Sequence, residues 1–326
     1  MTTAQTQQIT TAMRERRSRF VGAILVALSA CCFATLGIFG KLLMARGLDL
    51  QSTLAWRFGG AALILLFWML LRARWRIPLA QFAIAFAMGA IGYALQATLY
   101  FVAMDHIGVG LTSLLLYTYP AFVALLAWLV DHERPTRRRL VALGIAFIGT
   151  SLAADPRGPH PDMVGLVVGL ATGAWYAVYL TVGTRLVREV DSLAASGYVC
   201  LGAAASFLTV AIGGHGLDLP RSGVSLALVA GIVVVATVIP IIALFAGMRR
   251  LGTPRAALLS TLEPVVTVAL GAMILGERFG ASELGGGALI VAALILLQVG
   301  VSPASGGPDP SFAGRQEDAR GPRMRS

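Results

Sequence analysis

Long apolar segments separated by short polar ones make up most of the chain. Ten of these segments have about the 20 residues that a helix needs to cross the hydrocarbon core of a bilayer. They lie at 20–43, 52–71, 78–103, 109–130, 136–153, 162–184, 191–213, 223–247, 254–275 and 281–300. Backbone groups in lipid must be hydrogen-bonded within their own segment, so the segments are predicted to be helices. The predicted fold is an all-α polytopic membrane protein with ten transmembrane helices.

The composition supports a membrane protein. The 326 residues are 57% hydrophobic and 13% charged, whereas soluble domains carry about 25% charged residues. Residues 1–19 and 301–326 are polar and are predicted to be disordered tails. The net charge of +10 does not indicate a nucleic-acid partner, because the basic residues lie in short blocks between apolar segments.

The basic residues predict the orientation of the chain. Twenty of the 26 lysines and arginines fall in the two tails and at one set of alternate connections, and four arginines (Arg46, Arg157, Arg221 and Arg278) fall in the opposite connections. Cytoplasmic loops are enriched in basic residues, so both termini are predicted to be cytoplasmic. Lys41 and Arg57 lie near the outer ends of the first two segments, where they are expected to reach the headgroup region.

The two halves of the sequence resemble each other. "LLLYTYPAFVALLAWLVDHERPT", residues 114–136, matches "LLSTLEPVVTVALGAMILGERFG", residues 258–280, without a gap at an offset of 144. An offset of 143 pairs Gly22 with Gly165 and Gly40 with Gly183. We therefore divide the chain into two repeats, 20–153 and 162–300. Each repeat has an odd number of spans, so the second is predicted to be inverted relative to the first, an arrangement typical of secondary transporters.

Two motifs carry a family resemblance. Each repeat ends in a proline followed, after twelve residues, by Glu-Arg: Pro120 with Glu133-Arg134, and Pro264 with Glu277-Arg278. With "LEPV" and "LGER" in the second half, this pattern resembles the EamA-type repeat of the drug/metabolite transporter superfamily, with most likeness to YddG-type amino-acid exporters. The resemblance implies a central cavity lined mainly by the first, third, fourth, sixth, eighth and ninth spans.

Glu263 is the candidate for chemistry inside the membrane. The other acidic residues lie in loops, tails or span ends, whereas Glu263 lies near a span centre, where an ionisable group is costly and points to function. It could recognise a substrate ammonium group or couple transport to protons. It could instead repair the helix broken at Pro264. The first repeat has Tyr119 in this place.

Aromatic side chains at mid-depth predict a substrate site. Tyrosine and tryptophan usually gather at membrane interfaces, but several lie near span centres here. The candidates are Tyr93, Gln96 and Tyr100 on one face of the third span, Tyr117 and Tyr119 on the fourth, and Thr172, Trp175, Tyr176 and Tyr179 on one face of the sixth. Such stripes suit amphipathic solutes, although interhelical hydrogen bonds would also explain them.

Three prolines are predicted to interrupt spans. Pro120, Pro240 and Pro264 fall in the fourth, eighth and ninth spans. Interrupted helices at matching places in two halves indicate moving parts in transporters, so we expect a role in gating. Local accommodation without motion is the alternative.

An enzyme is disfavoured by the sequence. The four histidines lie in loops or at span ends without metal-ligand spacing, and no nucleophile or phosphate-loop motif is present. We expect no catalytic residue, metal or cofactor. The favoured function is export of amino acids, including aromatic or apolar ones, by a secondary carrier that works as a monomer by alternating access in the bacterial inner membrane. Drug, nucleobase or nucleotide-sugar transport and, more remotely, a polytopic membrane enzyme are the alternatives.

Overall fold

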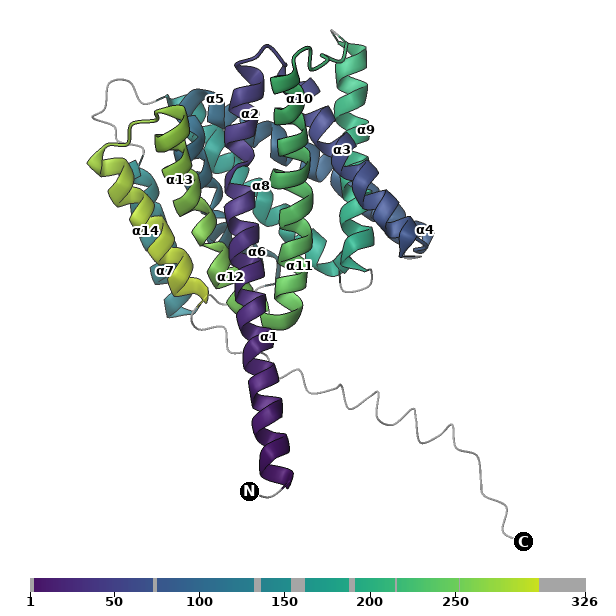
Figure 1. Ribbon diagram of the computed structural model, residues 1–326. Coiled ribbons are helices and arrows are strands. Elements are labelled where there is room, and N and C mark those ends of the chain that lie inside the picture. The colour runs from purple at the N-terminus through teal and green to yellow at the C-terminus, as the bar shows by residue number, and fades with distance from the viewer. Residues whose placement is uncertain are drawn as a thin grey trace.

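The computed structural model describes residues 3–72, 75–131, 136–153, 162–187, 191–214, 216–251 and 253–298. All regular structure in these ranges is helical (Figure 1). The α-helices are α1 (Thr3–Ala34), α2 (Leu36–Met44), α3 (Leu50–Leu71), α4 (Leu79–Ala87), α5 (Ala94–Leu116), α6 (Tyr119–Asp131), α7 (Arg137–Ala153), α8 (Met163–Val187), α9 (Ser192–Gly213), α10 (Gly223–Ala230), α11 (Ile239–Leu251), α12 (Thr253–Ser260), α13 (Leu262–Leu275) and α14 (Ala281–Gln298). Two π-helices, η1 (Met88–Tyr93) and η2 (Gly231–Val238), continue α4 and α10.

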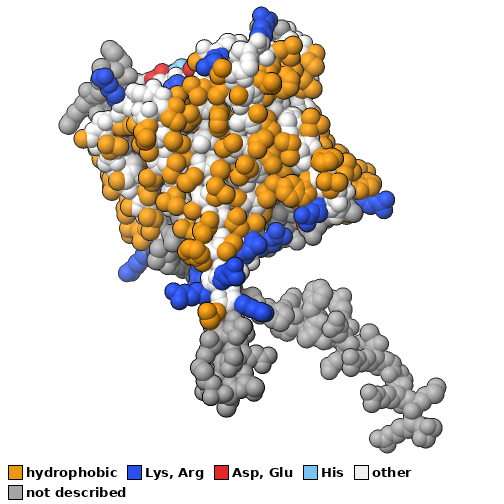
Figure 2. All heavy atoms as spheres, in the orientation of Figure 1, with side chains coloured by type: hydrophobic (Ala, Val, Ile, Leu, Met, Phe, Trp, Pro, Cys, Tyr) orange, Lys and Arg blue, Asp and Glu red, His pale blue; other side chains and the backbone are white. Residues whose placement is uncertain are grey.

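The helices are long and apolar enough to cross a membrane. In the described residues, six runs meet this criterion: Arg16–Met44, Leu50–Leu71, Leu79–Leu116, Met163–Val182, Leu193–Gly213 and Gly223–Leu251. Shorter apolar helices lie at Leu140–Ala153, Leu262–Leu275 and Ala281–Leu297. Figure 2 shows hydrophobic side chains over the face made by α1, α10, α11, α13 and α14, with basic side chains gathered at the rim where the N-terminal part of α1 leaves the bundle. The count of ten spans stays a prediction.

The third and fourth predicted segments differ from their expected bounds. The third segment and the start of the fourth form one run, Leu79–Leu116, inside which Gly108 leaves the helical region at φ 79° and ψ 167°. This backbone conformation is nearly restricted to glycine, so the chain changes direction there. A second break follows Leu116, and α6 begins at Tyr119.

The breaks in helical geometry recur at the offset of the sequence repeat. Adding 144 to the residue numbers of η1 gives 232–237, which lie within η2. The same shift moves residues 109–116, the part of α5 after Gly108, to 253–260, the bounds of α12. In each half a new helix, α6 or α13, starts within three residues of that segment's end. The internal repeat is therefore visible in the local backbone as well as in the sequence.

Helices of the first half pack mainly against helices of the second half. The most extensive pairings are α3 with α9, α7 with α14, α1 with α11, and α5 with α8. Two of these pairings use equivalent glycines: a Cβ at Gly22 would lie 2.9 Å from the Arg250 Cβ, and one at Gly165 would lie 2.6 Å from the His106 Cβ. Small residues permit such close approach of helices in membranes. The largest buried cluster, around Phe58, lies between α2, α3, α5, α9 and η2.

Candidate functional site

Five tyrosine rings form a continuous file between helices. Tyr93 stacks on Tyr179 at 5.5 Å between ring centroids, Tyr179 on Tyr176 at 6.2 Å, Tyr176 meets Tyr119 edge-on at 4.9 Å, and Tyr119 lies 5.9 Å from Tyr117. Tyr93 ends η1, Tyr176 and Tyr179 belong to α8, Tyr117 lies in the break after α5, and Tyr119 begins α6. All five are buried or half-buried. Five of the predicted aromatic residues, from three spans, are thus brought together in what we call the tyrosine file.

One end of the tyrosine file contacts Glu263. The Tyr117 hydroxyl donates to Glu263 Oε2 at 2.7 Å, and it lies 3.2 Å from the carbonyl oxygen of Ser260. That carbonyl has no helical partner four residues later, because Pro264 has no N–H. The Tyr117 hydroxyl lies where it can serve this carbonyl, in competition with the Glu263 carboxyl. The Glu263 carboxyl keeps one oxygen free of this contact.

The three prolines lie just inside helical segments. Pro120 is the second residue of α6 and Pro264 the third of α13, so each follows a break. Proline is well tolerated in the first helical turn, where the N–H that it lacks would have no partner. Pro240 is the second residue of α11, which continues η2 in an unbroken helical run, and its carbonyl accepts from the Ser29 hydroxyl at 2.8 Å. Pro120 and Pro264 thus lie at the starts of new segments and Pro240 does not, while a gating role stays a prediction for all three.

Arg57 lies at the other end of the tyrosine file. It is the eighth residue of α3, about two turns into the helix, and only 1% of its surface is exposed. Its Nε donates to Thr237 Oγ1 at 3.1 Å and its Nη2 to the Tyr93 hydroxyl at 3.3 Å. The guanidinium also lies over the Phe58 ring, 4.5 Å from its centroid. The expectation that Arg57 reaches the headgroup region is wrong, because these partners hold it inside the bundle.

The other predicted site residues lie around the file with different roles. Trp175 Nε1 donates to the carbonyl of Gly92 in η1 at 2.8 Å, and the Thr172 hydroxyl donates to Val168 O in its own helix. Gln96 is 4% exposed, and its Oε1 has no hydrogen-bond partner among the described residues. Tyr100 packs edge-on against Phe101 at 5.9 Å. Thr172 is thus satisfied locally, whereas Gln96 retains bonding capacity.

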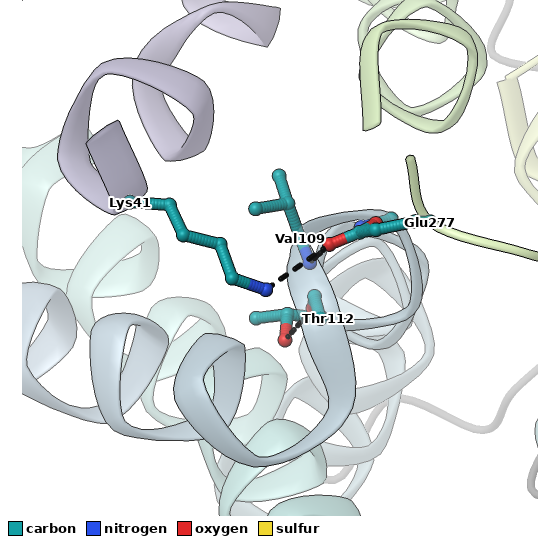
Figure 3. A network of polar contacts seen from close by, with 6 residues as sticks. Lys41, Val109, Thr112 and Glu277 are labelled. Atoms are coloured by element: carbon teal, nitrogen blue, oxygen red, sulfur yellow. Dashed lines mark hydrogen bonds and ion pairs between the residues drawn. The ribbon is translucent and has the colours of Figure 1, made fainter. Parts of the chain in front are cut away.

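A second charged group, the Glu277 cluster (Lys41, Gly108, Val109, Gly110, Thr112 and Glu277), lies apart from the file. The Glu277 carboxylate accepts from Val109 N at 2.7 Å and from Gly110 N at 3.1 Å, and Lys41 Nζ lies 3.4 Å away (Figure 3). These amides begin the helical segment after Gly108, so Glu277 caps it. The Thr112 hydroxyl donates to Gly108 O at 2.7 Å. The Glu-Arg motif of the second repeat thus has a structural function.

Arg57 and Thr237 were missed as site residues. Arg57 was assigned to the interface from its position near a span end, and Thr237 has no distinctive pattern in an apolar run. An arginine two turns inside a span was nevertheless a sufficient signal, because charged groups at such depth usually face the bundle interior. The described residues hold no group of three or more His, Cys, Asp or Glu side chains that could bind a metal ion.

Comparisons with known proteins identify the family. The sequence profile of the EamA-like transporter family matches the chain twice, at residues 20–154 and 163–299. Over 278 residues the chain is 28% identical to "Uncharacterized transporter YcbK" of Bacillus subtilis, covering 81% of this chain and 88% of the relative. It is 25% identical over 234 residues to "Uncharacterized transporter sll1319" of Synechocystis, covering 65% and 66% of the two chains. An uncharacterized transporter of Archaeoglobus fulgidus is 28% identical over 198 residues, covering 60% and 70%.

A solved crystal structure of a protein is also similar, with a TM-score of 0.61 over 85% of this chain and 97% of that chain. At 18% identity this likeness shows the fold alone. The family and the relatives' names indicate a transporter rather than an enzyme. The resemblance to the EamA-type repeat is therefore confirmed, and the chain belongs to the EamA-like transporter family of multi-pass membrane proteins.

Proposed function

We propose that this chain is a secondary carrier that exports amino acids, including aromatic and apolar ones, across the bacterial inner membrane by alternating access. One observation carries the proposal: a cation, Arg57, and an acid, Glu263, lie at opposite ends of the tyrosine file. Arg57 belongs to the first half and Glu263 to the second. The cation can bind the carboxylate of an amino acid and the aromatic faces its apolar body, while the acid at the far end of the file can exchange a proton.

The proposed topology has ten spans, with repeats 20–153 and 162–300 inverted relative to each other and both termini cytoplasmic. The distribution of arginines supports this orientation. The recurrence of η1 in η2, and of the end of α5 in α12, supports two copies of one unit. Because one chain supplies both halves, we propose that a monomer forms the complete pathway.

The contacts of Tyr117 support proton coupling at Glu263. Tyr117 has one hydroxyl proton but lies within hydrogen-bond distance of two acceptors, Ser260 O and Glu263 Oε2. When Glu263 is ionised, Tyr117 donates to the carboxylate. When Glu263 is protonated, the carboxyl can donate to Tyr117, which then donates to Ser260 O. The trio therefore has two hydrogen-bonded states that differ by one proton.

Transport in proteoliposomes tests the proposed function. The purified chain would be reconstituted and given labelled aromatic, apolar and polar amino acids, a nucleobase and a cationic drug, with and without a pH gradient. We expect flux of an aromatic or apolar amino acid that responds to the gradient. Movement of the nucleobase or the drug without any amino-acid flux would contradict the proposal.

Two variants test the coupling. Glu263→Gln should keep exchange of amino acids but lose the response to the pH gradient, because the amide cannot take up the proton. Tyr117→Phe is the matched control: it removes the hydroxyl but keeps the carboxyl, so the response to the gradient should persist. An unchanged response in Glu263→Gln would assign coupling to another group.

A further inference from the structure

Arg57 carries a buried charge that the described residues do not neutralise. Its two hydrogen bonds go to neutral hydroxyls, those of Thr237 and Tyr93. In the described part of the chain, no carboxylate lies within ion-pair distance of its guanidinium, and no acceptor bonds Nη1. The Thr237 hydroxyl is also engaged, because it donates to the carbonyl of Ile232 in η2 at 2.8 Å.

A guanidinium in this position favours an anionic ligand. Removing a cation from water costs several kcal/mol, and stacking on Phe58 and two bonds to hydroxyls offset only part of this cost. Buried charges in proteins are usually paired. The free edge of the guanidinium presents parallel N–H groups, which match the two oxygens of a carboxylate.

Two further buried polar groups, about one helical turn from Arg57 or from its partner Tyr93, lack hydrogen-bond partners among the described residues. Thr53 Oγ1 and Gln96 Oε1 are the side-chain atoms in the described ranges that are buried without a hydrogen bond. Thr53 precedes Arg57 by four residues, so both lie on one face of α3. Gln96 follows Tyr93, the Arg57 partner, by three residues at the start of α5. Unsatisfied buried polar groups in native structures call for an explanation, and a role in ligand binding is one.

We propose that Arg57 forms a carboxylate-binding subsite for an α-amino acid. The Arg57 guanidinium donates to both carboxylate oxygens, the Thr53 hydroxyl donates to one of them, and the Gln96 side-chain oxygen accepts from the substrate amino group. The inference rests on the proposed function and narrows its substrates to molecules that carry a carboxylate. A phosphate group fits less well, because its second negative charge would need a second cation, and the described neighbours of Arg57 include none.

Ligand binding to the purified full chain tests the subsite without transport. The probes are phenylalanine, 3-phenylpropanoate, phenethylamine and inorganic phosphate, which separate the carboxylate from the amino group and from other anions. We expect phenylalanine to bind more tightly than 3-phenylpropanoate, and neither phenethylamine nor phosphate to bind comparably. Arg57→Gln should weaken phenylalanine binding at least about tenfold, the loss expected for charge-assisted hydrogen bonds.

Two other variants complete the test. Arg57→Lys keeps the charge but not the paired donors, so it should bind phenylalanine with intermediate affinity. Arg46→Gln removes an exposed arginine from the connection between α2 and α3 and should bind as the unmodified chain does. If Arg57→Gln does not fold, the affinities of the unmodified chain and of Arg57→Lys for the four probes still test the subsite. Equal affinity for phenethylamine and phenylalanine, or full affinity in a folded Arg57→Gln, would overturn the subsite.

The binding and transport experiments together distinguish a failure of the carboxylate subsite from a failure of the proposed function. Binding of phenylalanine that depends on Arg57, without flux in proteoliposomes, would support the subsite and contradict amino-acid transport. Flux of amines without any carboxylate binding would overturn the subsite and leave a carrier of another substrate class.

Discussion

Arg57 and Glu277 are both charged side chains inside the helix bundle, but their surroundings differ. The Glu277 carboxylate accepts from two backbone amides and pairs with Lys41, and 13% of its side chain is exposed. Arg57 is 1% exposed, and its partners among the described residues are two neutral hydroxyls and the rings of Phe58 and Tyr93. A charge whose partners are all in the protein stabilises the fold, whereas a charge left without a counter-ion is available for a ligand.

The comparison is tested most strongly by Glu277→Ala. The variant leaves the amides of Val109 and Gly110 and the ammonium of Lys41 without their acceptor. We expect a loss of about 3 kcal/mol in the free energy of unfolding, typical of a partly buried charge with hydrogen bonds. Equilibrium unfolding in mixed micelles measures it.

Glu283→Ala is the matched control for that variant. Glu283 also accepts from a backbone amide, that of Gly280 at 2.8 Å, but in an exposed position. Removing it should cost about 1 kcal/mol or less. Similar losses in the two variants would contradict the stabilising role assigned to Glu277.

Gly108→Ala should have the next largest effect. At φ 79° and ψ 167° an alanine is strained, and its Cβ would lie 2.9 Å from Glu277 Oε1. We expect a loss of about 2 kcal/mol. Gly144→Ala is the control, because Gly144 is helical and a Cβ there meets no atom within 4 Å. That control should be neutral or stabilising.

A double variant sharpens this result. Gly108 and Glu277 belong to one cluster, so their effects should not add. Gly108→Ala combined with Glu277→Ala should cost less than the sum of the single changes, because the clash with the carboxylate disappears. Full additivity would show that the glycine acts independently of the cap.

Arg57→Met should change stability least among the buried groups. The methionine keeps apolar volume against Phe58, and no carboxylate partner is left behind in the described residues. Replacing a buried charge by an apolar side chain is often neutral or stabilising, so we expect a change within about 1 kcal/mol and the loss of phenylalanine binding. A cost above that of Glu277→Ala would reverse the comparison.

The sequence predicted the residues of the tyrosine file better than the contacts at its two ends. Tyr93, Tyr119, Tyr176 and Tyr179 could be grouped because helical spacing and mid-depth position are readable from one chain. The Tyr117 contact to Ser260 O could not be predicted, since it depends on how two halves pack. The contacts of Glu277 with Val109, Gly110 and Lys41 could not be predicted for the same reason.

Backbone geometry was also only partly predictable. Proline is visible as a helix breaker, but the breaks lie before Pro120 and Pro264 rather than at them. The change of direction at Gly108 was not predicted, because most glycines in apolar segments serve close packing instead. The π-helices η1 and η2 have no sequence signature of their own, although their recurrence follows from the repeat.

The smallest effect is expected for an exposed hydrogen-bonded contact between His106 and Asp162. His106 Nδ1 lies 2.7 Å from Asp162 Oδ2, and Asp162, which precedes α8, also accepts from Gly165 N at 3.0 Å. The Gly165 N–H, followed by His106, lowers the pKa of Asp162. Because the pKa of Asp162 is lower in the folded than in the unfolded state, the ionised carboxylate stabilises the fold at pH values above the ordinary aspartate pKa of about 4. This contribution is lost as the pH falls through the pKa of the folded state.

Asp162→Asn should therefore lower the melting temperature slightly at pH 7, by less than Gly108→Ala does, since an exposed pair gains little in water. The difference from the unmodified chain should shrink at acid pH, where the aspartate is protonated and resembles the amide. Melting curves at neutral and acid pH measure it. A difference that persists undiminished at acid pH would assign the effect to the hydrogen bond with Gly165 rather than to charge.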